Sequence, residues 1–112
     1  MGDSFQVVFM TAPNKAEAAI IAEALVGDHL AACVNIVNAC HSIYRWQGRI
    51  VRDDEVLMLA KIKASDFAAL ERKVLELHSY DVPEIITVEL AAIASGYRAF
   101  LEDCLGGDPR SK

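Results

Sequence analysis

Residues 31–63, AACVNIVNACHSIYRWQGRIVRDDEVLMLAKIK, decide the fold of this 112-residue chain. Two runs rich in β-branched and apolar residues, 31–44 and 49–63, flank a turn that contains Gly48, and this pattern predicts one long β-hairpin. A strand of about fourteen residues spans roughly 45 Å, whereas strands in small domains usually have about five or six residues. We therefore predict that the hairpin projects beyond the rest of its own domain.

A strand and a helix are predicted before the hairpin. FQVVFMTA at 5–12 has the nearly continuous apolar character of a buried strand, and it closes at Pro13. The next helix should begin after Asn14, whose side chain can cap the first turn, with Glu17 at the capping-box offset. Gly27 is expected to end this helix.

A second helix and a fourth strand are predicted after the hairpin. The helix should begin at Ser65 and stop near His78. Its buried face is predicted by an apolar stripe with i, i+3, i+7, i+10 spacing, formed by Phe67, Leu70, Val74 and Leu77. Proline at 83 favours an extended backbone at Val82, so the strand is expected from about Glu84.

The chain ends in a third predicted helix, with Ser95 as its cap and the glycines at 106–107 as its stop, before a tail that we expect to be disordered. The order of elements is β-α-β-β-α-β plus a terminal helix. This order predicts the α+β class, as a ferredoxin-like sandwich with two helices on one face of an antiparallel sheet. We expect a single domain over 1–112, with an ordered core at about 5–105.

Charge and cysteine content narrow the class of protein. The net charge of −5 opposes a phosphate backbone, so neither nucleic acid nor an anionic membrane surface is an expected partner. The cysteines form an odd set without CxxC spacing, which favours reduced thiols and a cytoplasmic location. The acidic start MGDSFQ and the short run VVFM do not match a secretory or membrane segment.

The tip of the hairpin carries large apolar side chains that a monomer would leave in water. Tyr44 and Trp46 combine an apolar ring with a hydrogen-bonding end, as interface anchors do, and Ile50 lies across the turn. We predict that these three residues are buried against other copies of the chain. The alternative is a bulge near Asn38 or Arg52 that lets the hairpin curl back over its own sheet.

Candidate ligands for a soft metal ion such as copper include Cys40 and His78. No pair of candidates has the spacing of a preformed cage, so a metal site would need residues from distant segments. Cys33 and Cys104 are better interpreted as small buried hydrophobic residues. His78 could instead interact with the last carbonyls of the helix before it.

The acidic stretch DDE at 53–55 is the main candidate for acid-base chemistry, because Asp53 and Glu55 share one face of a strand. We expect the two aspartates to protect a strand edge, and Glu55 to pair with Lys61 or with an arginine across an interface. No phosphate-binding loop or nucleophile elbow is present in the sequence, so we do not expect an enzyme.

Four separated motifs together resemble the CutA divalent-cation tolerance family over about residues 5–105: ACVNI at 32–36, YRWQG at 44–48, EVLMLAKIK at 55–63 and YDVPEI at 80–85. The resemblance implies a compact homotrimer whose long hairpins interlock, with a general likeness to PII-type signalling trimers. Family members often carry HPY before VPE. This chain has HSY, so Ser79 should leave the strand entry in place but loosen it.

The resemblance also implies a role in tolerance of metal ions such as copper, and some members are linked to membrane anchoring of acetylcholinesterase. We expect a non-enzymatic homotrimer that needs no cofactor and binds copper or another divalent ion weakly through Cys40 or His78. The likeness to PII trimers implies an alternative, a sensor of a small anionic ligand in the cleft between subunits, near Trp46, Glu55, Lys61, Tyr80 and Glu84. A scaffold that presents its trimer surface to a partner is a third hypothesis.

Overall fold

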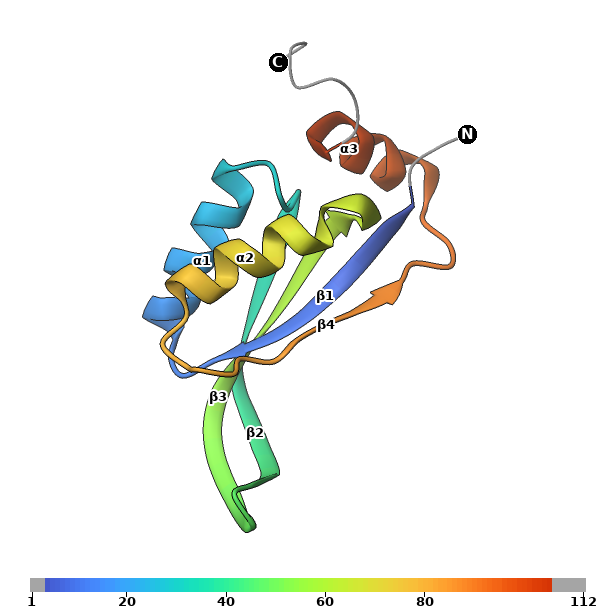
Figure 1. The fold of residues 1–112 in the computed structure, drawn as a ribbon. Helices are drawn as coiled ribbons and strands as arrows, with labels where there is room; N and C mark the ends of the chain where they lie inside the picture. The colour runs from blue at the N-terminus through green and yellow to red at the C-terminus, as the bar shows by residue number, and fades with distance from the viewer. Residues whose placement is uncertain (1–3, 106–112) are drawn as a thin grey trace.

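The computed structural model describes residues 4–105 and confirms the predicted order of elements (Figure 1). The elements, in chain order, are β1 (Phe5–Ala12), α1 (Lys15–Gly27), β2 (Cys33–Trp46), β3 (Arg49–Lys63), a 3-10 turn (Ala64–Asp66), α2 (Phe67–Leu77), β4 (Ile85–Glu89) and α3 (Ser95–Leu105). The predicted stop at 106–107 and the tail lie outside the described residues.

One four-stranded antiparallel sheet, in the order β2-β3-β1-β4, forms the central layer. Helices α1 and α2 cover one of its faces (Figure 1). Successive side chains of a strand point to opposite faces, so every second residue of β1 and β3 faces the helices. The core therefore contains Val8, Met10, Met58, Ala60 and Ile62 from the sheet, and Ile21, Leu25, Leu70 and Val74 from the helices.

Helix α1 begins and ends close to the predicted residues, but the contacts at its first turn and the backbone conformation after its last residue differ from the prediction. The side chain of Asn14 accepts a 2.8 Å hydrogen bond from the amide of Glu17, as predicted. The Glu17 carboxylate does not complete a capping box, because it accepts hydrogen bonds from Ser79 instead. Gly27 is the last helical residue, but the left-handed backbone conformation falls on His29, with φ of 60°.

Helix α2 starts later than predicted. Ser65 lies in the 3-10 turn, and no side chain of the described residues caps α2, which begins at Phe67. Leu70 and Val74 from the predicted stripe are fully buried, whereas Leu77 at the end of the helix is exposed. The backbone leaves the helix at His78, as predicted.

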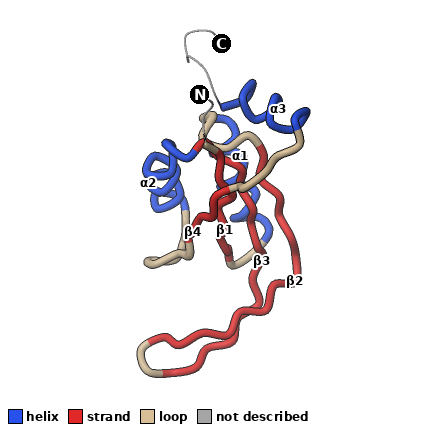
Figure 2. The backbone as a smooth tube through the Cα atoms, turned by 90° about the vertical axis from the view of Figure 1, so that its right-hand side faces the viewer, coloured by secondary structure: helices blue, strands red, loops and turns tan. Residues whose placement is uncertain are grey.

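The β2–β3 hairpin projects beyond the helices and bends (Figure 2). A register shift between Val37 and Cys40, with Ala39 at φ of 63°, marks a β-bulge that accounts for the bend. The bulge thus lies near Asn38, as the alternative interpretation supposed. The hairpin nevertheless does not fold back over its sheet, since Trp46 and Ile50 remain 47% and 59% exposed in the single chain.

The face of the sheet opposite α1 and α2 is only partly covered. At one end, α3 buries Phe5 under Leu101 and Leu105. The rest of this face, which we call the open sheet face, carries Val7, Phe9, Val37, Leu57, Leu59, Ile86 and Val88. Of these, Val37, Ile86 and Val88 are 46–55% exposed. Within residues 4–105, no second layer covers this part of the face.

None of the helices in the described part of the chain is long and apolar enough to cross a membrane.

Candidate functional site

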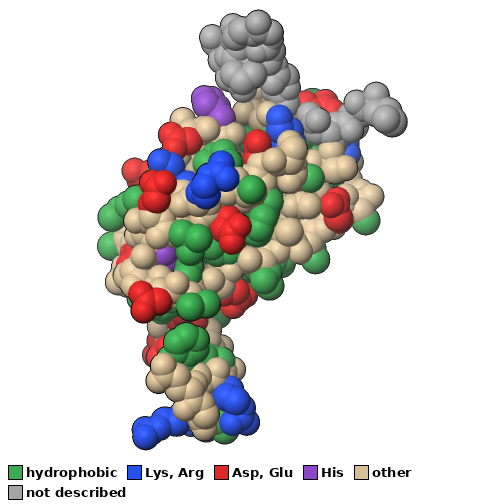
Figure 3. Space-filling view, in the orientation of Figure 1, with side chains coloured by type: hydrophobic (Ala, Val, Ile, Leu, Met, Phe, Trp, Pro, Cys, Tyr) green, Lys and Arg blue, Asp and Glu red, His purple; other side chains and the backbone are tan. Residues whose placement is uncertain are grey.

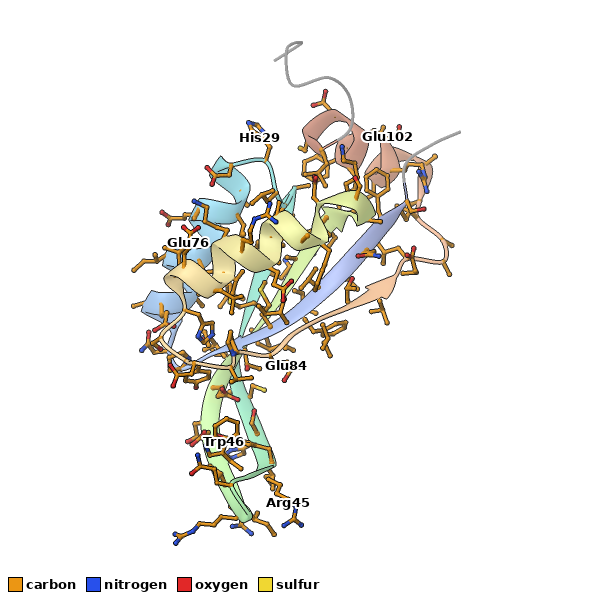
Figure 4. The ribbon with its side chains drawn as sticks, in the orientation of Figure 1. His29, Arg45, Trp46, Glu76, Glu84 and Glu102 are labelled. Atoms are coloured by element: carbon orange, nitrogen blue, oxygen red, sulfur yellow. The ribbon has the colours of Figure 1, made fainter. Side chains whose placement is uncertain are left out.

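A cleft of about 710 Å³ lies between the projecting hairpin and the segment 80–84 that leads into β4. Its walls are Thr11 from β1, residues 41–44, Trp46, Asp53 and Glu55 from the hairpin, and residues 80–84. In Figure 4, Trp46 lies between the tip of the hairpin and Glu84, while Arg45 points away from the body of the molecule. The bend in the hairpin therefore creates a concave site within one chain.

The bulge determines which hairpin side chains share the cleft. Beyond it, Cys40 pairs with Glu55 and Ser42 pairs with Asp53, so these four side chains lie on one face of the hairpin. Strand alternation places Tyr44 and Trp46 on the same face. Asp54 and most of the His41 side chain lie on the opposite face, where they form a 2.6 Å ion pair in solvent, and His41 also reaches the edge of the cleft.

Two tyrosines hold two carboxylates in the cleft. The phenol of Tyr44 donates a 2.5 Å hydrogen bond to Asp53, and the phenol of Tyr80 donates a 2.9 Å hydrogen bond to Glu55. The hydrogen bond to Asp53 raises the pKa of Tyr44. Burial, together with the hydrogen bond to Glu55, raises the pKa of Tyr80 well above its usual value. Both phenols therefore stay protonated and act as donors.

His78 positions Tyr80. Its Nδ1 accepts a 3.1 Å hydrogen bond from the Tyr80 amide, so the ring proton is on Nε2, which donates a 2.8 Å hydrogen bond to the Thr11 carbonyl. The two aromatic rings also contact each other, with centroids 4.7 Å apart. The imidazole thus links α2 to β1, and it does not interact with the last carbonyls of its own helix.

The cleft has a negative character, because none of the described lining residues is Lys or Arg and four of them are carboxylates: Asp53, Glu55, Asp81 and Glu84. Glu55 is only 7% exposed. Trp46, Glu55, Tyr80 and Glu84 were predicted to line a cleft between subunits, and in the structure these four residues line a cleft within a single chain. Lys61 does not join them. It lies six residues from Glu55 along β3, about 20 Å away, where it donates to Asn35.

The candidate metal ligands do not form a cluster. Cys40 is half-buried at the bulge, 3.9 Å from the hydroxyl of Ser42, and His78 uses both ring nitrogens in the contacts described above. Cys33 lies near Tyr97 of α3, at the other end of β2, where burial and the thiol raise the pKa of Tyr97. Within residues 4–105, no group of three or more His, Cys, Asp or Glu side chains could hold a metal ion.

Sequence reasoning missed two features. Asp81 and Thr11 line the cleft because of the path of the chain after α2, for which the local sequence gives no signal. The open sheet face could have been found. The runs VVFM and VLMLA lack polar and apolar alternation, and such strands are typically buried on both faces.

Comparisons with known proteins agree on one family. Residues 6–104 match the model of the CutA1 divalent ion tolerance protein family. The divalent-cation tolerance protein CutA of Thermus thermophilus is 47% identical over 97 residues, which cover 87% of this chain and 91% of that protein. The chloroplastic CutA of Arabidopsis thaliana is 36% identical over 97 residues, 87% of this chain but only 53% of that protein. The chain thus spans about half the length of this plant relative.

Solved structures give the same result. The divalent cation tolerance protein of Thermus thermophilus superimposes with a TM-score of 0.88 at 44% identity, and the alignment covers 91% of this chain and 99% of that one.

Proposed function

Because the chain belongs to the CutA1 divalent ion tolerance family, we propose that it acts as a non-enzymatic homotrimer in the response to divalent metal ions. The observation that supports the trimer is the open sheet face. Burying an apolar side chain such as Ile86, Val88 or Val37 stabilises by about 1.5 to 3 kcal/mol. Covering this face and the Tyr44–Trp46–Ile50 tip with other copies supplies the missing second layer.

The arrangement around Ser79 supports a role without catalysis. Ser79, His78 and Glu17 have the residue types of a hydrolytic triad, and the Ser79 hydroxyl donates a 3.0 Å hydrogen bond to Glu17. Neither ring nitrogen of His78 is free to accept the serine proton, because one donates to Thr11 and the other accepts from Tyr80. The three residues therefore form a structural link and not an activated nucleophile.

We propose Cys40 as the weak copper ligand and assign His78 to structure. A thiolate is a suitable donor for a soft ion, and Cys40 lies on the same hairpin face as the Glu55 carboxylate. Copper titration by calorimetry under reducing conditions tests this. We expect Cys40→Ala to lose binding and Cys104→Ala, the matched control, to retain it. Equal stoichiometry in wild type and Cys40→Ala would remove the assignment.

A second candidate function is small-molecule sensing in the cleft, for which the size of the cleft and its aromatic walls are the supporting observation. The PII-like sensor of an anionic ligand is less well supported, since an anion would face four carboxylates and Lys61 lies elsewhere. Thermal-shift screening against charged metabolites tests sensing, because a ligand that binds only the folded state raises the melting temperature. We further propose a cytoplasmic location, consistent with three cysteines that form no disulfide.

A further inference from the structure

The chemistry of the cleft selects for one kind of ligand. Tyr44, Trp46 and Tyr80 contribute aromatic rings, and the carboxylates lie among them. Glu55 is more than nine-tenths buried, and the only partner it has among the described residues is a neutral phenol. A buried carboxylate without a cation is costly, and a cation that entered the cleft would offset that cost.

The spacing of the acidic groups suits an extended cation. Asp53 and Glu55 are two residues apart on the same face of β3, so their backbones lie about 6.6 Å apart. Each gives one carboxylate oxygen to a tyrosine, through Oδ2 and Oε2 respectively. A planar guanidinium has several donors for the remaining oxygens and can stack on an aromatic ring, whereas a hydrated metal ion gains nothing from the rings.

We propose that the cleft binds a small organic cation through a guanidinium or ammonium group, with Asp53 and Glu55 as its charge partners and Trp46 as its aromatic contact. This inference deepens the second candidate function and rests on it, and it requires that part of the Trp46 ring stays open to the cleft when other copies cover the hairpin tip. The cleft volume, about 710 Å³, lies in the range of small-molecule sites.

The same chemistry could come from a second copy of the chain. Arg45, Arg49 and Arg52 are exposed at the hairpin tip, and Lys and Arg side chains gather there in Figure 3. A tip arginine of a neighbouring subunit would present a guanidinium to the cleft. The experiment must therefore separate a free ligand from this source.

Trp46 provides the measurement, because it is the only tryptophan of the chain and it lines the cleft. Titration of the full chain with methylguanidinium should change its fluorescence saturably, and calorimetry should give the same affinity. Asp53→Asn should weaken binding by about tenfold or more, the effect of losing a charged hydrogen bond. Asp54→Asn removes the same charge from the opposite face and should bind like wild type.

The outcomes decide between the sources. A saturable response in wild type assigns the site to a free cation. A response only in the Arg45→Ala, Arg49→Ala, Arg52→Ala triple variant supports the cation site and assigns its occupant in the wild type to a tip arginine, either Arg49 opposite Trp46 on the same hairpin or an arginine of a second copy. Three results would overturn the proposal. The first is no response in either protein, and the second is equal weakening of binding in Asp53→Asn and Asp54→Asn. The third is a response to magnesium or acetate as large as the response to methylguanidinium. Copper titration and oligomeric state are measured separately, so the failure of this inference leaves the metal-response proposal intact.

Discussion

The phenol of Tyr80 lies 2.9 Å from Oε2 of Glu55, and this hydrogen bond joins the segment after α2 to the base of the projecting hairpin. Burial and this bond raise the pKa of Tyr80 in the folded chain. A raised pKa means that the folded state holds the phenolic proton more tightly than the unfolded state does. Its stabilising contribution is therefore complete below the unfolded pKa of about 10 and is lost as the pH rises above it.

Tyr80→Phe should reduce the loss of stability at alkaline pH. We expect the free energy of unfolding of the wild type to fall more steeply than that of Tyr80→Phe between about pH 9 and 11. Urea denaturation across this pH range measures the difference. Parallel curves for the two proteins would show that the phenol does not carry the effect.

His78→Gln should destabilise the fold by about 1 to 3 kcal/mol, because it disturbs buried hydrogen bonds to Thr11 and Tyr80. His41→Gln is the matched control. His41 is exposed and pairs with Asp54 in solvent, so its loss should cost less than about 1 kcal/mol. Chemical denaturation of both variants gives the comparison, and equal losses would contradict a structural role for His78.

Leu70→Ala and Leu75→Ala test the orientation of α2. Leu70 is fully buried against the sheet, so its truncation should cost about 2 to 5 kcal/mol. Leu75 is 49% exposed on the same helix, and we expect a cost of about 0.5 kcal/mol. Thermal unfolding followed by circular dichroism would rank the two. A larger effect at Leu75 would mean that other copies cover this side of the helix.

Ile86→Lys places a charge on the open sheet face and should shift the proposed trimer to a monomer. Ile86 is 55% exposed in the single chain, so the monomer itself should remain folded. Size-exclusion chromatography with light scattering reports the mass, and circular dichroism reports the fold.

Trp46→Ala is expected to weaken assembly as well, since the proposed trimer buries this ring and truncating a buried aromatic residue costs about 3 to 5 kcal/mol. Light scattering over a dilution series measures the change. A wild type that is monomeric at micromolar concentration would contradict the trimer itself.

The sequence predicted those features that local chemistry controls. Asn14 caps α1 with its own side chain, and the stripe of α2 correctly identified Leu70 and Val74 as core. Glu17 was expected at the capping box, yet its carboxylate bonds to Ser79, 62 residues away. Such a partner depends on how α2 packs on α1, and no local pattern records it.

The candidate site was predictable in part for the same reason. Strand alternation places Asp53 and Glu55 together, so their shared face follows from the sequence. Glu55 and Lys61 belong to the same sequence motif, but this does not place them in the same cleft. The motif runs along β3, so its two ends lie too far apart to reach one cleft. The approach of Tyr80 to Glu55 required the three-dimensional path of the chain.

The bulge between Val37 and Cys40 has a consequence for sequence length. Val37 pairs with Leu57 and Cys40 pairs with Glu55, so β2 carries one residue more than β3 between these pairs, and removing Ala39 would leave a regular ladder with the same pairs. Tyr44 and Trp46 would keep their face, but the hairpin would lose the bulge that bends it, and the concave surface would open without a single substitution. The number of residues in this short segment is therefore as much a determinant of the site as their identity.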